Sequence, residues 1–263
     1  MQDAIEYKME IKKVSDERWD IAQKSEKEYW ITYTTESLKK ELGDLYSKKA
    51  SILLKEWSKW IKLNKNTKIL QIGCGPEDVI NHFKIGKKYS LDPLAEFYKK
   101  RFKFDYKESG LMEGMGEKIE FPDKYFNIVI LMNVLDHVHF PEKVLSEIKR
   151  VLKDDGIFYF ENFIYQKNFI HIAKIWGKFK KIFTVKMFNI HHPYMFTRED
   201  LKKMLLEKFL IIHEDLGKDI GFYKNMKELK KSKRKNKRLM IKIPAIFGLY
   251  GIINYTSICK KLN

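Results

Sequence analysis

The feature that most constrains this fold is a short apolar run that ends in two glycines. Residues 68–72 read KILQI, which is typical of a buried strand, and Gly73 and Gly75 follow directly. Glycine lets the backbone adopt positive φ or approach a ligand without a Cβ in the way. In open α/β sheets, ligands bind at the carboxyl ends of the strands. The sequence therefore predicts an α/β fold with a ligand held near residues 73–75.

Strand and helix patterns alternate on both sides of this loop. Strand character is found at residues 68–72, 89–91, 126–132, 157–160, 210–213 and 252–259, and helix character at residues 37–63, 76–83, 93–102, 141–152, 166–183 and 197–209. This alternation predicts a doubly wound, mostly parallel sheet. The helix at residues 197–209 should begin with a capping box in which Asp200 pairs with Thr197.

The chain of 263 residues is long enough for one α/β domain with appendages. We expect an arm and helices over residues 1–64 that pack on a domain over residues 65–263. Trp19 and Trp30 of the arm are costly to expose, so the arm should dock. Two basic, apolar helical insertions are expected at about residues 165–196, as a lid, and at about residues 222–250. Both should shape the acceptor site.

Composition narrows the functional classes. Cys74 and Cys259 are far apart and lack metal-ligand spacing, so we expect a reducing, cytoplasmic location with no disulfide scaffold and no metal. The first residues are too polar for a signal peptide, and no apolar run could span a bilayer. The two basic, apolar insertions leave two alternatives: a cap packed on the sheet, or peripheral contact with an anionic membrane.

The net charge of +17 raises the question of nucleic acid as a partner. Only six of the 52 basic residues are arginines, whereas selection for phosphate recognition favours arginine. A nucleic-acid partner therefore ranks below a small molecule. The sequence does not indicate an oligomeric state.

The residues after the glycine loop argue against a dinucleotide. A dinucleotide fingerprint would place a third glycine at position 78, where Asp78 stands. A pyrophosphate there would meet Glu77 and Asp78 instead of backbone amides. These acids are compatible with a cationic ligand that carries no phosphate. Asp92 ends the next strand, where a carboxylate can accept hydrogen bonds from both hydroxyls of a ribose.

Taken together and in order, these segments resemble the class I S-adenosylmethionine-dependent methyltransferases, in the small-molecule branch called type 11. The resemblance covers about residues 65–215. It is carried by ILQIGCGP (69–76), SLDP (90–93), GEKIEFPDKYFN (116–127), IVILMNVLDHV (128–138), residues 141–156, and HPYMFTREDLKKMLLEKF (192–209).

The resemblance implies S-adenosylmethionine as cofactor and a Rossmann-like, seven-stranded sheet. The glycines would pass under the methionine part of the cofactor, Asp92 would bind the ribose, and Gly116 with Glu117 would lie beside the adenine. The chain departs from the family pattern at Gln71, Met115 and Glu77. The cofactor-binding residues implied are Gln71, Gly73, Cys74, Gly75, Asp92, Pro93, Met115, Gly116, Glu117 and Asn133.

Methyl transfer is an in-line displacement, and a hydroxyl acceptor must also lose a proton. The candidate catalytic residues are His137, His191, His192 and Glu161. His137 resembles the family's histidine after the fourth strand, and anchoring of that turn is its alternative role. Glu161 would orient an acceptor hydroxyl or be a solvated acid, and His139 is expected at the surface.

The sequence thus predicts a methyltransferase for a small-molecule acceptor. The arm and lid resemble members that act on sugars, so the first interpretation is a hydroxyl of a sugar or glycan precursor. A lipid or quinone precursor, RNA, and a non-catalytic binding module remain alternatives. If Gln71, Glu77 and Met115 prevent cofactor binding, the non-catalytic binding module would be favoured.

Overall fold

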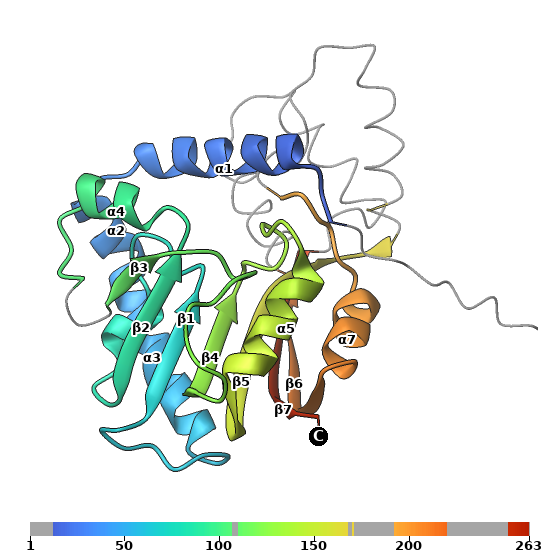
Figure 1. Ribbon diagram of the computed structural model, residues 1–263. Helices are drawn as coiled ribbons and strands as arrows, with labels where there is room; N and C mark the ends of the chain where they lie inside the picture. Colours follow the sequence, from blue (N-terminus) through green and yellow to red (C-terminus); the bar gives the residue numbers. More distant parts are fainter. Residues whose placement is uncertain (1–12, 107–109, 168–169, 171–191, 220–251, 263) are drawn as a thin grey trace, which may run out of the picture.

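A seven-stranded sheet organises the protein (Figure 1). The computed structural model describes residues 13–106, 110–167, 170, 192–219 and 252–262. The strand order is β3-β2-β1-β4-β5-β7-β6, and only β7 runs antiparallel to its neighbours β5 and β6. This confirms the predicted mostly parallel sheet. The strands are β1 (Lys68–Ile72), β2 (Lys87–Asp92), β3 (Leu111–Glu113), β4 (Phe126–Met132), β5 (Leu152–Tyr165), β6 (Phe209–Asp219) and β7 (Ile252–Lys261).

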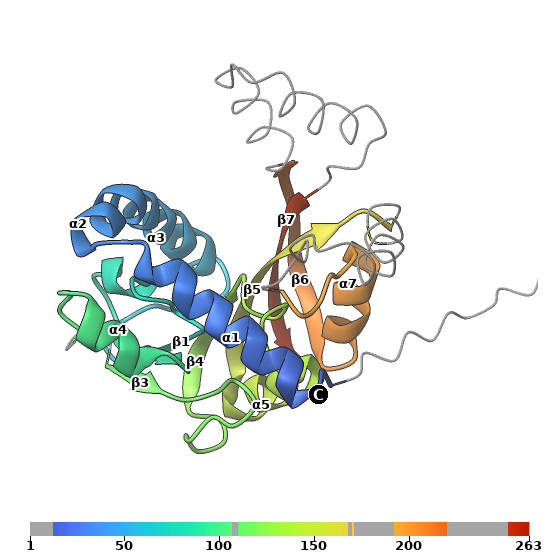
Figure 2. The same cartoon turned by 90° about the horizontal axis from the view of Figure 1, so that it is seen from above.

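Helices cover both faces of the sheet (Figures 1 and 2). Side chains alternate between the faces along each strand, so Ile128 and Ile130 of β4 pack with Trp57 of α3. Val129 and Leu131 pack on the opposite face with α5 and α7. The helices are α1 (Asp16–Ile31), α2 (Thr35–Leu38), the π-helix η1 (Lys39–Gly43), α3 (Asp44–Trp57), α4 (Ala95–Arg101), α5 (Pro141–Val151) and α7 (Arg198–Leu206).

The N-terminal arm docks on the domain, as predicted. Its helix α1 lies across the carboxyl ends of the strands (Figure 2). Trp19 stacks on His139 with ring centroids 5.6 Å apart, and Trp30 meets Tyr98 edge-on at 6.3 Å. One side of α1 therefore faces the edge of the sheet where ligands bind in such folds.

The helix predicted at residues 76–83 is wrong. The structure has only a short 3-10 turn there, η2 (Val79–His82), after an extended segment. The reason is Asp78, whose Oδ1 accepts from the Asn81 N–H at 2.9 Å while Oδ2 accepts from the Ser90 hydroxyl at 2.6 Å. These hydrogen bonds tie the chain to β2 before a full helical turn can begin.

The boundaries of the other helices and strands differ less from the predicted ones. Helix α5 ends at Val151 as expected, but the Asp154-Asp155-Gly156 stop lies within β5 as an irregularity between Leu152 and Ile157. The capping box of Thr197 and Asp200 is confirmed at the start of α7. The proposed lid helix at residues 166–183 and most of both insertions lie outside the described residues. In the part of the chain that the structure describes, no helix has the length and apolarity needed to cross a membrane.

Candidate active site

The glycine loop between β1 and η2 has the backbone geometry that only glycine adopts easily. Gly73 and Gly75 have φ values of 63° and 69°, in the left-handed region. A Cβ on Gly73 would also lie 2.4 Å from a methyl group of Val134. The Gly73 N–H donates to the carbonyl of Leu91 at 2.7 Å, which fixes the loop against the end of β2.

Asp92, the last residue of β2, is held by this loop. Its Oδ2 accepts from the Gly75 N–H at 2.9 Å, and its Oδ1 accepts from the Leu94 N–H at 2.8 Å. Each carboxylate oxygen therefore keeps lone pairs for a ligand hydroxyl. The side chain is buried, and burial raises the pKa of Asp92 to about 6. The group is ionised at neutral pH.

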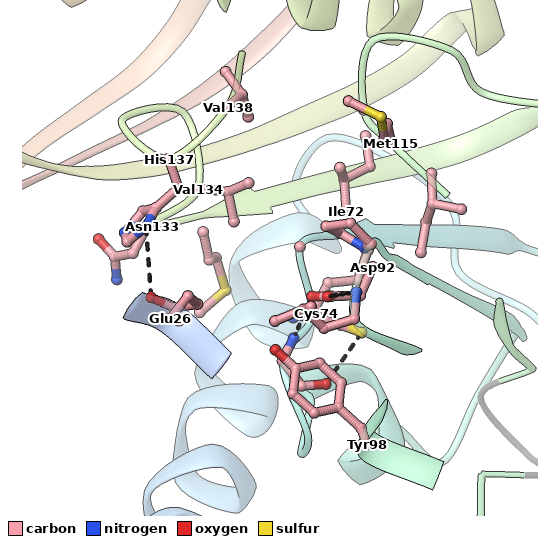
Figure 3. Close-up of a pocket in the computed structure, with 18 of the residues that line it drawn as sticks. Glu26, Ile72, Cys74, Asp92, Tyr98, Met115, Asn133, Val134, His137 and Val138 are labelled. Carbon is pink, nitrogen blue, oxygen red and sulfur yellow. Dashed lines mark hydrogen bonds and ion pairs between the residues drawn. The ribbon is translucent and has the colours of Figure 1, made fainter. Parts of the chain in front are cut away.

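A cavity of about 470 Å³ opens beside this loop (Figure 3). That volume lies within the ~300–1,000 Å³ typical of small-molecule sites. Its lining includes all ten predicted cofactor-binding residues, and also His137 and Glu161. The structure therefore brings these twelve residues together, while their individual roles stay predictions. His192 is not part of the lining, and His191 lies outside the described residues.

Gln71, which departs from the family pattern, and Asn133 both place polar atoms in this cavity. The side-chain oxygens of Gln71 and Asn133 are buried and have no hydrogen-bond partner among the described residues. A buried unpaired acceptor is costly, so both oxygens suit a ligand that supplies N–H or O–H donors. Burial raises the pKa of the Cys74 thiol well above its ordinary value, so Cys74 stays a neutral thiol.

Two helices supply cavity residues that the sequence reasoning missed. Helix α1 contributes Glu26 to the lining, and α3 contributes Tyr46 and Lys49. The Lys49 ammonium contacts Glu161 Oε2, which also accepts from the Tyr159 hydroxyl at 2.6 Å. The solvated alternative for Glu161 is wrong, because the side chain is only 3% exposed. No sequence signal marked these helix residues beyond the tryptophans of the arm.

The cavity is acidic although the chain is basic. Lys49 is the only lysine in the described lining, and no arginine is present there. Five carboxylates line it, from Glu26, Glu77, Asp92, Glu117 and Glu161. One of them also has a structural function, because Glu117 Oε1 accepts from the His139 and Phe140 N–H groups at the start of α5. The electrostatic environment therefore favours a cationic ligand over a phosphate-bearing one.

A histidine and carboxylate cluster adjoins the cavity after β4. Asp136 is 1% exposed, and its Oδ2 lies 2.6 Å from His192 Nδ1. Burial alone would raise the pKa of Asp136, but the two histidines outweigh it and lower that pKa. Burial alone would lower the pKa of His192, but the hydrogen bond and charge of Asp136 raise it. His137 lies between them and the cavity, with its ring centroid 4.2 Å from that of His192.

The expectation that His139 lies at the surface is wrong. Its side chain is 15% exposed and stacks under Trp19 of α1, with Nε2 3.0 Å from Asp16 Oδ1. The backbone carbonyl of His139 also accepts from the Val14 N–H and the Tyr194 hydroxyl. His139 therefore helps to dock the arm.

Comparison with known proteins shows which family the central part of the chain resembles. A family model described as "Methyltransferase domain" matches residues 70–160, the segment that contains the glycine loop, Asp92 and the β4 end. Over this segment the chain is similar to the type 11 methyltransferase family. The match supports the predicted resemblance to this class, whose cofactor is S-adenosylmethionine.

Two curated proteins match over part of this chain. An uncharacterized methyltransferase of Schizosaccharomyces pombe is 32% identical over 112 residues, which are 37% of this chain and 40% of the relative. The sterol 24-C-methyltransferase of Candida albicans is 32% identical over 108 residues, which are 37% of this chain and 28% of the relative. The chain thus spans less than half the length of either.

A solved structure shares the fold across most of the chain. The geranyl diphosphate C-methyltransferase of Streptomyces coelicolor aligns with a TM-score of 0.56, at 10% identity, over 87% of this chain and 84% of that chain. This similarity confirms the Rossmann-like methyltransferase fold.

Proposed function

We propose that this protein is an active methyltransferase that moves the methyl group of S-adenosylmethionine to a hydroxyl of a small molecule. The observation that carries the proposal is Asp92, which is buried, ionised at neutral pH and held by the glycine loop at the wall of the cavity. In that position a carboxylate can bind the two hydroxyls of the cofactor ribose.

The charge of the cavity supports this cofactor. The reactive sulfonium and the α-ammonium group of S-adenosylmethionine are both cationic, and five carboxylates line the cavity. The unpartnered oxygens of Gln71 and Asn133 suit the ammonium as well. A dinucleotide or RNA phosphate would meet the same acids unfavourably, which supports the small-molecule interpretation over the RNA one.

A sugar or glycan precursor is our first proposal for the acceptor. The Oδ1 atom of Asn254 in β7 is a further buried acceptor at the cavity without a partner among the described residues. Hydroxyl donors of a sugar would satisfy it. His137 and Glu161 line the cavity and are our candidates to accept a proton and to orient the acceptor.

A lipid or quinone precursor is the second candidate. Trp19, Trp30 and Phe163 give part of the cavity an aromatic lining, which suits an apolar acceptor. One relative is a sterol methyltransferase. A lipid acceptor would require contact with a membrane surface, and the two basic segments proposed for that contact lie outside the described residues.

Calorimetry with S-adenosylhomocysteine tests the cofactor site. We expect binding by the wild type, no binding of NAD, and at least tenfold weaker binding by Asp92→Asn, because each hydrogen bond to a charged group contributes about 1.5–3 kcal/mol. Asp154→Asn is the matched control, since Asp154 is exposed and outside the cavity lining. Unchanged affinity in Asp92→Asn, or no binding by the wild type, would overturn the proposed site.

Methyl transfer from labelled S-adenosylmethionine then separates the acceptor classes. We expect product with neutral sugars and glycosides, and none with RNA. Product with isoprenoid alcohols or quinone precursors alone would move the second candidate to first place. Cofactor binding without transfer to any of these acceptors would favour the non-catalytic alternative.

A further inference from the structure

The histidine and carboxylate cluster beside the cavity contains more side chains of the metal-binding kind than a single general base needs. Asp136 and His137 follow β4, and His192 comes from the segment before α7. One ligand atom from each of these three residues lies within 4.8 Å of the other two. We propose that Asp136, His137 and His192 bind a divalent transition-metal cation at the edge of the cofactor cavity.

The unsatisfied oxygen of Asp136 is the first support. Oδ2 of Asp136 is 2.6 Å from His192 Nδ1, but Oδ1 is buried and has no hydrogen-bond partner among the described residues. His137 Nε2 lies 4.0 Å from Oδ1. A buried carboxylate oxygen without a donor is costly, and a cation between Oδ1 and the histidine would satisfy it.

Glu26 of α1 is the second support. Its Oε2 lies 3.7 Å from His137 Nδ1 (Figure 3), whereas Asp136 Oδ1 lies 4.0 Å from the other ring nitrogen, Nε2. Metal-bound histidines usually donate their second ring N–H to a carboxylate, which fixes the tautomer and strengthens the ligand. The other Glu26 oxygen accepts from the Trp30 indole N–H at 2.9 Å, so this carboxylate is held in place.

The charge balance is the third support. With neutral imidazoles, Asp136 and Glu26 give the cluster two negative charges, and Arg18, which donates to the His192 carbonyl at 3.1 Å, adds one positive charge. The cluster therefore keeps a net negative charge, which favours a cation. Two histidines and one carboxylate form a ligand set typical of Fe²⁺, Zn²⁺ and related cations, whereas Mg²⁺ and Ca²⁺ prefer oxygen ligands alone. The site could not be recognised from residue spacing, because His192 lies 55 positions after His137.

Three protein ligands leave coordination positions open for water or another oxygen. His137 lines the cavity, so an acceptor oxygen is the ligand that would fit there. Such a cation would bind the acceptor hydroxyl and lower its pKa. Because His137 would then be a ligand and could not act as the base, a solvent base would take the proton before methyl transfer. This role rests on the proposed function, whereas binding of the cation itself does not.

Metal titration of the full chain tests the inference. Protein stripped with a chelator is titrated with Co²⁺ while its visible absorption is recorded, and Zn²⁺ then displaces Co²⁺. We expect one equivalent to bind the wild type, and stoichiometric binding to be lost in Asp136→Asn and His192→Gln. Glu26→Gln should weaken binding about 10–100-fold, because Glu26 is argued to act through His137. His213→Gln is the control, since His213 in β6 is exposed.

S-adenosylhomocysteine binding is measured on the same samples to separate two failures. Variants that bind S-adenosylhomocysteine but not Co²⁺ are folded, and they support the site. A wild type that binds S-adenosylhomocysteine but no Co²⁺ overturns the cation site and leaves the proposed function intact. Equal Co²⁺ binding in the wild type, Asp136→Asn and His192→Gln also overturns it, because the cation would then lie elsewhere.

Discussion

Gly73 shows how a single residue sets the shape of the cofactor loop. Its φ of 63° is unfavourable for any residue with a Cβ, and Val134 of the next strand end occupies the space where that Cβ would lie. Gly110 has a similar φ of 55°, but among the described residues a Cβ there would meet only the carbonyl oxygen of Lys88, at 3.7 Å. The two glycines therefore separate the effect of conformation from the effect of packing.

Alanine substitution at these two positions should have different consequences. Gly110→Ala should cost about 1–2 kcal/mol of unfolding free energy, from the left-handed conformation alone. Gly73→Ala should cost that plus about 1–3 kcal/mol for the collision with Val134, and should also weaken S-adenosylhomocysteine binding. Urea unfolding and calorimetry measure both effects. Equal costs in the two variants would show that Val134 moves aside freely.

The site residues that could be predicted from the sequence are those that lie at the ends of strands. Gly73, Gly75, Asp92 and Asn133 come directly at strand ends, and the carboxyl ends of parallel strands meet at one edge of the sheet. Lys49 could not be found in this way. Lys49 lies on helix α3, which packs on one face of the sheet. For such a helix the sequence pattern predicts the buried face, but not which polar residue reaches the cavity.

At the scale of elements, the segment after β1 departs most from the sequence pattern. Proline at position 76 and apolar residues at helical spacing indicated a helix, but tertiary hydrogen bonds of Asp78 to Ser90 and Asn81 favour a 3-10 turn. A side chain that bonds across to another strand cannot be recognised from local spacing. The β4 strand and the α5 helix were predicted closely because their apolar periodicity alone determines them.

The pH dependence of stability reports on Asp78 in this turn. Burial raises the pKa of Asp78 to about 6, against about 4 in the unfolded chain. Protonation therefore stabilises the folded state, so the contribution is fully present below pH 4 and is lost as the pH rises through 6. We expect the stability of the wild type relative to Asp78→Asn to fall by about 1–1.5 kcal/mol between pH 5 and 7.5.

Urea unfolding of the wild type and Asp78→Asn at both pH values measures this difference. Asp154→Asn is the control, because a hydrogen bond from Lys124 lowers the pKa of the exposed Asp154. Its difference from the wild type should not fall as the pH rises. A relative stability of Asp78→Asn that is independent of pH would show that Asp78 is ionised throughout this range.

At the scale of the whole molecule, a helix outside the matched domain closes the site. Helix α1 is highly charged and has only Ala22 and Ser25 buried, so its own sequence gives it little stability. Its contacts are with the cavity rim: Arg18 donates to the His192 carbonyl at 3.1 Å, and Trp30 packs against Tyr98. The cavity lining of Trp19, Glu26 and Trp30 therefore exists only while α1 is docked.

Amide hydrogen exchange tests whether a bound cofactor holds α1 in place. If release of the ligand requires α1 to open, ligand at ten times its Kd should slow exchange across Asp16–Ile31 about tenfold. Helix α5 should not change by this mechanism, because its buried face packs in the core away from the moving arm. Mass spectrometry with and without S-adenosylhomocysteine measures both segments. Unchanged exchange in α1 at saturating ligand would mean that the cofactor enters and leaves while α1 stays docked, through an opening elsewhere in the cavity wall.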